Sequence, residues 1–178
     1  MNIITSNPGK YREYKKILTD SKMHDIGYHE IQADTLEEVV EHGLRELREH
    51  APLIIDDSGL FIDAYKGFPG VYSSYVMNTL GCEGMIKLMD NIEDRKARFE
   101  CVIGYMDEAG SVMTFKGIVE GKIIHELLGS GGFGYDPIFI PKGYDRTFAQ
   151  MSTDEKNKIS HRGIAMEKLA THIGSIDL

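Results

Sequence analysis

This sequence of 178 residues lacks several features that would assign it at once to a functional class. It has no apolar run of about 18 residues, the length that a membrane-spanning helix needs. Its first residues, 1–7, are too short and too uncharged for a secretory signal peptide. We therefore expect a cytoplasmic protein that does not enter a membrane.

Cysteine and positive charge are also scarce. Cys82 and Cys101 are the only cysteines, and because they lie in unlike contexts we expect two reduced thiols rather than a disulfide. Two cysteines alone cannot make a zinc site. The 20 basic and 28 acidic residues give a net charge of -8, which argues against binding to a nucleic-acid polymer. A nucleotide monomer remains open, since a triphosphate needs few local cations and clustered carboxylates suit magnesium.

The length and composition are those of one ordinary globular domain over residues 1–178, with one lobe or two. Apolar residues make up 42% of the chain and charged residues 27%. No internal repeat, linker or low-complexity tract interrupts it. The fully apolar strand 53–55 is of the kind covered on both faces, as in α/β sheets.

The N-terminal segment predicts a strand that turns directly into a helix. Residues 2–5 form a short apolar strand, Asn7 is a good N-cap, and Pro8 suits the first position of a helix over about 9–18. Backbone N–H groups at such a helix start can bind an anion, with Lys10 adding a charge. The alternative is an ordinary capped turn. It is not a Walker A loop, because Tyr11 follows the lysine where Ser or Thr is required.

Two acidic positions stand out in the first third of the chain. Glu30 lies in an extended segment just before a helix whose capping box is Thr35 and Glu38, so it either points into a cleft or lies on the surface. Asp56 and Asp57 follow the apolar strand 53–55, and ligands of open α/β sheets bind at the carboxyl ends of strands. Alternation sends the two aspartates to opposite sides, so we expect only one in the site; the alternative is a simple turn.

The middle of the chain is less informative. Residues 67–76 form a constrained loop that is either a pocket wall or a packing loop. Residues 82–89 predict a short helix, and 97–105 with 112–121 predict a β-hairpin at the outer part of the sheet.

The richest stretch is 129–162. Gly129, Gly131 and Gly134 match G-x-G-x-x-G, but a strand over 137–141 follows instead of a helix, so a dinucleotide site is excluded. The glycines are expected to let the backbone approach a ligand while Phe133 and Tyr135 present ring faces.

The C-terminal tail predicts two helices. Ser152 and Glu155 form a second capping pair. Lys156 and Arg162 are six residues apart, so their convergence requires a break near Ser160. The last helix is expected to end near 173, with Gly174 just after it.

Five blocks in this order resemble the inosine triphosphate pyrophosphatase family. They are T-S-N-P-G-K, D-D-S-G-L, G-F-P-G-V-Y-S-S-Y, G-G-F-G-Y-D-P-I-F and E-K-N-K-I-S-H-R. The resemblance spans 5–162. It implies an α/β fold with an elongated mixed β-sheet flanked by helices, two lobes with a central nucleotide-binding cleft, and a homodimer. It also implies cleavage of purine nucleoside triphosphates such as ITP, dITP and XTP.

The resemblance further implies residue roles. Asp57 would be the proton acceptor and, with Glu30, a ligand of Mg²⁺. The substrate would be held by Thr5, Ser6, Asn7, Pro8, Gly9, Lys10, Ser58, Phe133, Gly134, Tyr135, Asp136, Lys156, His161 and Arg162. Thr5 to Lys10 would cradle the phosphates, Phe133 would stack on the purine, and His161 with Arg162 would read its oxo edge. Many bacterial members have a lysine in the helix after the metal-facing acid, and its absence here resembles the archaeal branch. Whether Arg45 or Arg48 replaces its phosphate contact is left open.

The reaction expected from this set is attack of water at the α-phosphorus, releasing the monophosphate and pyrophosphate. No nucleophilic triad is present, since there is no G-x-S-x-G and neither cysteine has an adjacent histidine. Two alternatives remain open: a related house-cleaning pyrophosphatase for modified pyrimidine nucleotides, and a purine-nucleotide-binding protein without catalysis.

Overall fold

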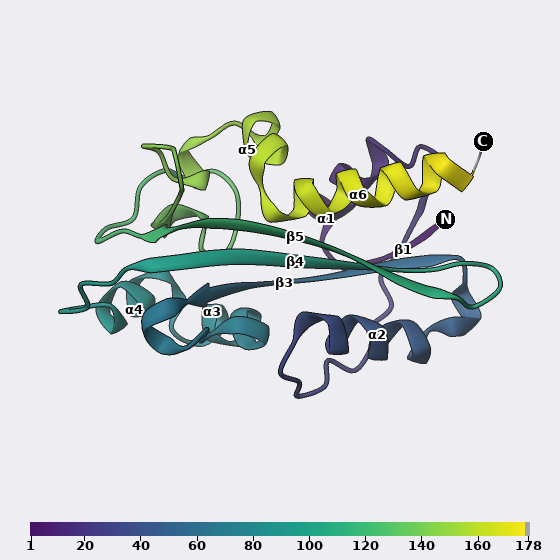
Figure 1. Cartoon of the computed structure of the whole chain (residues 1–178), viewed down its shortest axis with the longest axis horizontal. Helices are drawn as coiled ribbons and strands as arrows, with labels where there is room; N and C mark the ends of the chain where they lie inside the picture. Colours follow the sequence, from purple (N-terminus) through teal and green to yellow (C-terminus); the bar gives the residue numbers. More distant parts are fainter. Residues whose placement is uncertain (177–178) are drawn as a thin grey trace. The chain divides into compact units, whose positions relative to one another are not determined.

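The structure is a computed structural model that describes residues 1–176 (Figure 1). It has an α/β fold with one six-stranded sheet in the order β2-β1-β3-β4-β5-β6. The strands are β1 (Asn2–Ile4), β2 (Lys22–His24), β3 (Leu53–Ile62), β4 (Lys96–Met106), β5 (Val112–Ile123) and β6 (Phe139–Pro141). β1 pairs in parallel with β2 and β3, whereas β5 and β6 are antiparallel. The predicted α/β fold with a mixed sheet is confirmed.

The helices are α1 (Pro8–Lys15), α2 (Leu36–Glu46), α3 (Ser73–Thr79), α4 (Gly81–Leu88), α5 (Thr153–Ile159) and α6 (His161–Ile176). Three helices, α1, α2 and α5, begin just after the caps that the sequence predicted. The capping boxes Thr35/Glu38 and Ser152/Glu155 are both formed. The predicted break is also present, because Ser160 is extended between α5 and α6. Along the described residues no helix is both long and apolar enough to cross a lipid bilayer.

Several predicted boundaries were wrong. β3 does not stop at residue 55 but continues to Ile62, so Asp56 and Asp57 lie in the middle of the strand. The hairpin β4–β5 is inside the sheet order rather than at its outer part, and nearly all of β4 is buried. Only 139–141 of the predicted strand 137–141 is extended, because the Asp136–Ile138 segment forms a 3₁₀ turn. α1 ends earlier than predicted, and α6 continues through Gly174.

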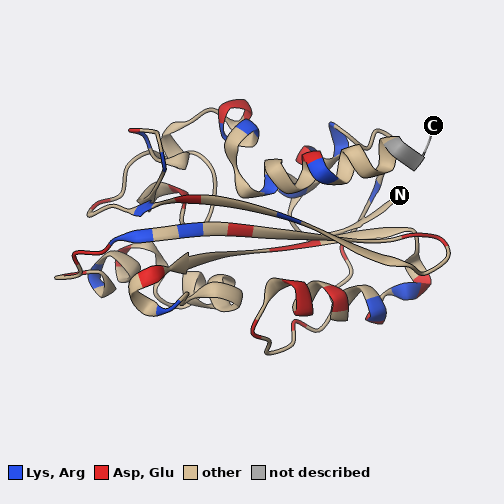
Figure 2. Cartoon of the chain, viewed as in Figure 1, with Lys and Arg blue, Asp and Glu red and all other residues tan. Residues whose placement is uncertain are grey.

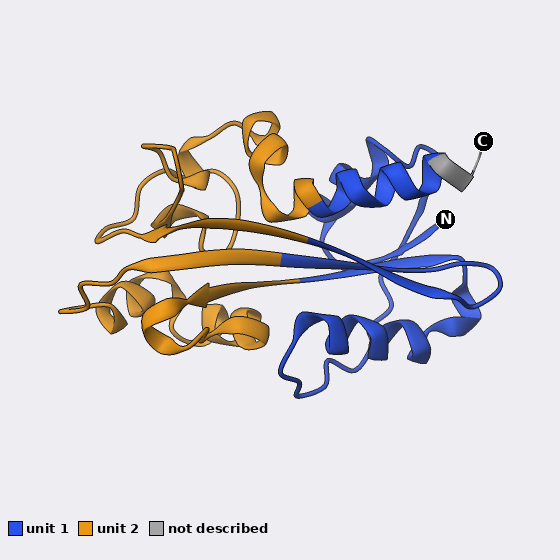
Figure 3. Ribbon diagram, viewed as in Figure 1, with its two compact units in different colours: residues 1–57, 101–116, 165–178 blue, residues 58–100, 117–164 orange. Residues whose placement is uncertain are grey.

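The chain forms two compact units, each built from separate stretches (Figure 3). Unit 1 comprises residues 1–57, 101–116 and 165 onward. Unit 2 comprises residues 58–100 and 117–164. β3, β4 and β5 each contribute residues to both units.

In unit 1 the sheet is covered on both faces by helices (Figure 1). On one face Ile54, Cys101 and Ile103 pack with Tyr14 of α1 and Leu169 of α6. On the other face α2 lies so close to β4 that a Cβ on Gly104 would meet Val40 and Leu44. The acidic residues of α2, coloured red in Figure 2, are at exposed or half-buried positions.

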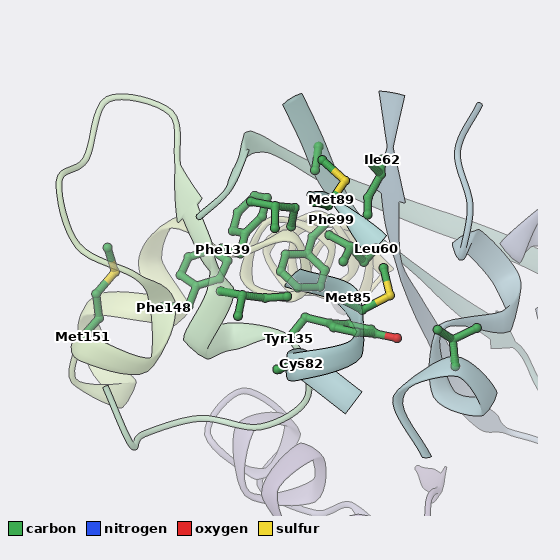
Figure 4. Close-up of a cluster of buried hydrophobic side chains, with 14 residues drawn as sticks. Leu60, Ile62, Cys82, Met85, Met89, Phe99, Tyr135, Phe139, Phe148 and Met151 are labelled. Atoms are coloured by element: carbon green, nitrogen blue, oxygen red, sulfur yellow. The ribbon is translucent and has the colours of Figure 1, made fainter. Parts of the chain in front are cut away.

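Unit 2 has its own apolar core (Figure 4). Phe99 of β4 packs at the centre of this core, and the centre of its ring lies 4.7 Å from the centre of the Phe139 ring. Residues from β3, α3, α4 and the segment 135–151 surround it. The loop 67–72 packs directly on β3, since a Cβ on Gly59 would lie 2.4 Å from the carbonyl oxygen of Gly70. This favours the packing-loop interpretation of that stretch.

Candidate functional site

The turn between β1 and α1 is tightly hydrogen-bonded within itself. The side-chain oxygen of Asn7 accepts the N–H groups of Gly9 (2.8 Å) and Lys10 (3.3 Å). The hydroxyl of Thr5 accepts the N–H of Asn7 at 3.1 Å. The predicted N-cap is therefore formed. Since the cap uses these two N–H groups, the ammonium of Lys10 is the principal positive group that the turn offers to an anion.

Lys10 is held by Asp56. Its Nζ lies 3.2 Å from Oδ1 of Asp56 and donates to the main-chain carbonyl of the same residue at 3.3 Å. The Asp56 side chain is only 2% exposed. Sγ of Cys101, on the neighbouring strand β4, lies 3.9 Å from Oδ2 of the same carboxylate. Asp56 thus belongs to the face of the sheet that α1 covers.

Asp57 belongs to the opposite face. It alternates with Asp56 along β3 and so shares the side of Ile55. Ile55 lies beside α2, where a Cβ on Gly43 would be 2.8 Å from Ile55 Cδ1 and 2.6 Å from the ring of Tyr28. Gly43 therefore leaves room for Tyr28 against α2.

Carboxylates gather around Tyr28. Burial raises the pKa of its hydroxyl well above the ordinary value, and the charges of Asp57, Asp56 and Glu30 raise it further. A neutral phenol among acids is a hydrogen-bond donor at all physiological pH. Glu30 and Asp57 are thus in one neighbourhood within unit 1.

This donor set fits magnesium better than a softer metal. No cluster of three or more His, Cys, Asp or Glu residues within 1–176 would hold a metal by protein ligands alone. Magnesium uses one or two carboxylates together with water and phosphate oxygens. Glu30 and Asp57 supply that number of hard ligands, while the third acid, Asp56, already holds Lys10.

Asp56 and Asp57 lie beside the end of β1, although their own strand, β3, continues beyond them. The parallel register pairs Asn2 with Leu53 and Ile3 with Ile54. Continued by two residues, it brings Thr5 level with Asp56. The rule that ligands bind at the carboxyl ends of parallel strands therefore applies here to β1 rather than to β3.

The second group of predicted residues lies in unit 2, on the glycine-rich loop 129–134. This loop lies against the 3₁₀ turn Phe148–Gln150, and Gly131 N–H donates to the Ala149 carbonyl at 3.0 Å. Gly132 has φ +71°, and a Cβ there would be 2.0 Å from Oδ2 of Asp136. The same oxygen accepts the N–H of Phe133 at 2.9 Å. The glycines thus permit close backbone packing around Asp136.

Two cations lie beside the ring of Phe133. Nζ of Lys156 is 4.6 Å and Cζ of Arg162 5.4 Å from the ring centre. Lys156 also forms a 2.5 Å ion pair with Asp136, and Arg162 donates to the Ser58 hydroxyl at 3.3 Å. Phe133 is 44% exposed. An exposed aromatic face beside buried hydrogen-bond donors suits a flat ring that carries acceptors.

Two predicted residues face the interior instead. Tyr135 lies in the unit 2 core (Figure 4), and its hydroxyl donates to the Ser73 carbonyl at 2.9 Å. Burial raises the pKa of this phenol, and Cys82 adds to the shift. The expectation that Tyr135 presents a ring face was therefore wrong, because packing in the core determines its orientation. His161 is also buried, with its ring stacked on Phe99 at 4.8 Å.

Both cysteines are free thiols, as predicted, and both are buried. The thiol of Cys82 donates to the Gly134 carbonyl at 3.3 Å and so supports the glycine-rich loop. Burial and the charge of Asp136 raise its pKa to about 11.

The structure thus gathers the predicted residues into two sets. Unit 1 holds the turn 5–10 with Glu30 and Asp57, and unit 2 holds Ser58, Phe133 to Asp136, Lys156, His161 and Arg162. Sequence reasoning missed Tyr28 and the role of Asp56. The signal for Tyr28 was its place two residues before Glu30, because residues i and i+2 of an extended segment share one side.

The chain was also compared with known proteins. The sequence profile of the Ham1 family matches residues 1–172. A dITP/XTP pyrophosphatase of Thermococcus kodakarensis is 53% identical over 173 residues, which are 94% of this chain and 93% of that protein. A dITP/XTP pyrophosphatase of Methanopyrus kandleri is 49% identical over 172 residues, which are 93% of this chain and 92% of that protein. The solved structure of the Staphylococcus aureus Ham1 protein superposes with a TM-score of 0.86 at 31% identity, covering 98% of this chain and 99% of that one.

Proposed function

Because this chain belongs to the Ham1 family, we propose that it is a dITP/XTP pyrophosphatase that hydrolyses non-standard purine nucleoside triphosphates to the monophosphate and pyrophosphate. Its substrates are ITP, dITP and XTP, and its role is to cleanse the cytoplasmic nucleotide pool. The observation that carries this proposal is the exposed Phe133 ring flanked by Lys156 and Arg162. It occurs in a chain about half identical to proteins named for this activity.

The triphosphate is assigned to the residues of unit 1. The turn Thr5 to Gly9 approaches the phosphates, and Lys10 offsets their charge. Positioning and charge neutralisation are the main demands of phosphoryl chemistry. A fixed ammonium next to the developing charge on pyrophosphate meets the second demand.

Asp57 is assigned as the proton acceptor for the attacking water. A general base must lie within hydrogen-bond reach of the water, and a carboxylate that is only half-buried remains accessible to one. Glu30 and Asp57 would hold Mg²⁺ from this chain. When bound, magnesium neutralises phosphate charge and makes a coordinated water more acidic.

The base is assigned to the residues of unit 2. Phe133 provides the stacking face, on backbone fixed by Gly134, Tyr135 and Asp136. Lys156 and Arg162 are obligate donors, so they match the 6-oxo group of hypoxanthine or xanthine and leave the 6-amino group of adenine unmatched. A mismatch of this kind gives discrimination of about 10⁴-fold. His161, stacked on Phe99, fixes the start of α6 and so the place of Arg162.

A pyrophosphate-release assay tests the function. It compares ITP, dITP, XTP, GTP, dTTP and ATP, with Mg²⁺ and with EDTA. We expect turnover of ITP, dITP and XTP but not of ATP or dTTP, release of pyrophosphate rather than orthophosphate, and loss of activity in EDTA. GTP has the same 6-oxo group, so its rate measures what the 2-position of the base contributes to selectivity. Preference for dTTP would support the pyrimidine pyrophosphatase instead. Tight purine-nucleotide binding with no product would support a binding protein.

The assembly proposed for this enzyme is a homodimer. Unit 2 exposes four large apolar side chains at and around α3, with Tyr75 71% exposed. They are Phe68, Tyr72, Tyr75 and Leu80. Exposed aromatic groups of this kind mark interaction surfaces, and a second copy of the chain is the proposed occupant. Sedimentation of the wild type and of Tyr75→Ser tests this: the dimer is expected to weaken, whereas a wild type that sediments as a monomer contradicts it.

A further inference from the structure

We infer that Asp56 is a positioning residue that acts through Lys10, while its neighbour Asp57 has the chemical role. This inference rests on the proposed function, because it assigns Lys10 to the phosphates. Asp56 itself does not touch the substrate. It fixes the ammonium group of Lys10 at the start of α1 before a ligand arrives.

The burial of Asp56 requires an explanation. It follows three residues of β3 that are fully buried, Leu53 to Ile55, and its own side chain is 2% exposed. A buried carboxylate is costly unless it is paired. An apolar residue would fill this position in the sheet at lower cost, so the carboxylate is best explained by what it holds.

The contacts of Asp56 hold Lys10 at two points. Oδ1 lies 3.2 Å from Nζ, and the main-chain carbonyl accepts from the same Nζ at 3.3 Å. A lysine side chain has four rotatable bonds and loses considerable entropy when it is fixed in one place. Two acceptors on one residue limit Nζ to a small region before phosphate binds, so that less entropy is lost on binding.

The position of Lys10 is important because few other positive groups are available in this turn. The N–H groups of Gly9 and Lys10 are directed at Asn7 Oδ1, and that of Tyr11 donates to the Asn7 carbonyl at 3.1 Å. The helix start therefore offers an anion its partial charge and one ammonium rather than several N–H groups.

Cys101 supports the same carboxylate from β4. Its Sγ is fully buried and lies 3.9 Å from Oδ2 of Asp56, whereas the Lys10 ammonium contacts Oδ1. A thiol is a weak donor, so it orients the carboxylate without competing with Lys10 for charge. This gives the buried cysteine a role in the same chain of contacts: Cys101 orients Asp56, and Asp56 positions Lys10.

A double-mutant cycle tests the inference. Asp56→Asn, Lys10→Met and the double variant are compared with the wild type by kcat and KM for ITP with Mg²⁺, and by the Kd of inorganic pyrophosphate from calorimetry. Asp56→Asn is expected to lower kcat/KM about tenfold and to weaken pyrophosphate binding in the wild-type background. In the Lys10→Met background it is expected to change both by less than about twofold, since a residue that acts through Lys10 has no effect without it.

Equal losses in both backgrounds, or no loss in either, would overturn the inference, because a general structural role does not depend on Lys10. Glu120→Gln, which breaks the exposed pair of Glu120 with Lys142, is the matched control and should change nothing in either background. If Asp56→Asn does not fold, Cys101→Ala replaces it in the cycle. Cys101→Ala is expected to lower kcat/KM for ITP about two- to threefold, and this loss must also vanish in the Lys10→Met background. A loss of kcat/KM that persists there would overturn the inference.

The cycle separates this inference from the proposed function. A wild type that releases no pyrophosphate from ITP would defeat the proposed function alone. The pyrophosphate Kd values would then still decide whether Asp56 acts through Lys10, because binding does not require hydrolysis.

Discussion

The ammonium of Lys156 lies 4.6 Å from the centre of the Phe133 ring. It is held there by Asp136, whose Oδ2 also accepts the Phe133 N–H. A single buried carboxylate thus fixes both the cation and the backbone of the aromatic residue beside it. The stacking face and the nearest donor are therefore placed relative to one another before any base arrives.

Phe133→Ala is expected to raise the KM for ITP by roughly 5- to 150-fold, because stacking of a base on an aromatic ring is worth about 1–3 kcal/mol. The kcat should change less, since the reacting phosphate is elsewhere on the nucleotide. Steady-state kinetics measures both. Tyr144→Ala is the matched control, because Tyr144 is about equally exposed (46% against 44%) and belongs to no proposed site. A KM that stays at the wild-type value would contradict the stacking role.

Lys156→Met is expected to lower the free energy of unfolding by about 3–5 kcal/mol, because it leaves the buried Asp136 carboxylate without its cation. Urea denaturation measures this difference. The control is Lys142→Met, which removes the exposed ion pair with Glu120. It is expected to leave the midpoint of the urea unfolding transition unchanged. Equal midpoints for the two variants would show that Asp136 does not depend on Lys156.

Gly132→Ala is expected to destabilise the protein more than Gly110→Ala. Both glycines have positive φ, +71° and +85°, so each alanine has a backbone cost of roughly 1–2 kcal/mol. Only at Gly132 does the new Cβ also collide with Asp136, whereas nothing lies within 4 Å at Gly110. Urea denaturation of both variants compares the costs, and equal values would mean that the loop moves away from Asp136 freely.

Asp57→Asn is expected to lower kcat for ITP by about 10²–10⁴-fold, the usual contribution of a general base. The Kd for the nucleotide should change much less, because Phe133 and the cations of unit 2 are untouched. Rapid-quench kinetics and calorimetry separate the two quantities. Asp63→Asn, at an exposed ion pair with Arg98, is the control. A variant with near-normal turnover would exclude Asp57 as the proton acceptor.

Cys82 is expected to be inert to alkylation at neutral pH. With a pKa of about 11, only about 0.1% of the thiol is ionised at pH 8. Since the folded pKa is raised, the thiolate appears only as the pH approaches 11, and the rate should rise about tenfold per pH unit until then. Peptide mapping after iodoacetamide labelling measures this slope for Cys82 alone. A plateau below pH 9.5 would contradict the raised pKa.

Locally encoded features were predicted correctly from the sequence. The caps at Asn7, Thr35 and Ser152 and the break at Ser160 all depend on side chains within three residues of the backbone they bind. The convergence of Lys156 and Arg162 followed from that break. The family was identified from ordered motifs, and the profile match confirms it.

Features that depend on distant contacts were missed. The residues after Ile55 have the composition of a turn, yet β3 continues through Asp56, Asp57 and Gly59. The charge of Asp56 is neutralised by Lys10. At Gly59 the carbonyl of Gly70 occupies the space that a side chain would need. Tyr135 follows a run of glycines, so the sequence suggests an exposed position, but its side chain is buried in the core around Phe99. Neither partner is visible in the local sequence.

The interleaving of the two units has a consequence for biosynthesis. Unit 1 begins with the first residue of the chain, but its core includes Ala165, Met166 and Leu169 of α6. During translation the N-terminal strands and α1 therefore cannot complete this core until α6 has left the ribosome. A nascent chain stalled before residue 165 exposes the apolar surface of Ile3, Tyr14 and Ile54. Maturation of this protein is thus expected to be a post-translational event, and truncation from the C-terminal side should be far more damaging than its distance from Asp57 in the sequence suggests.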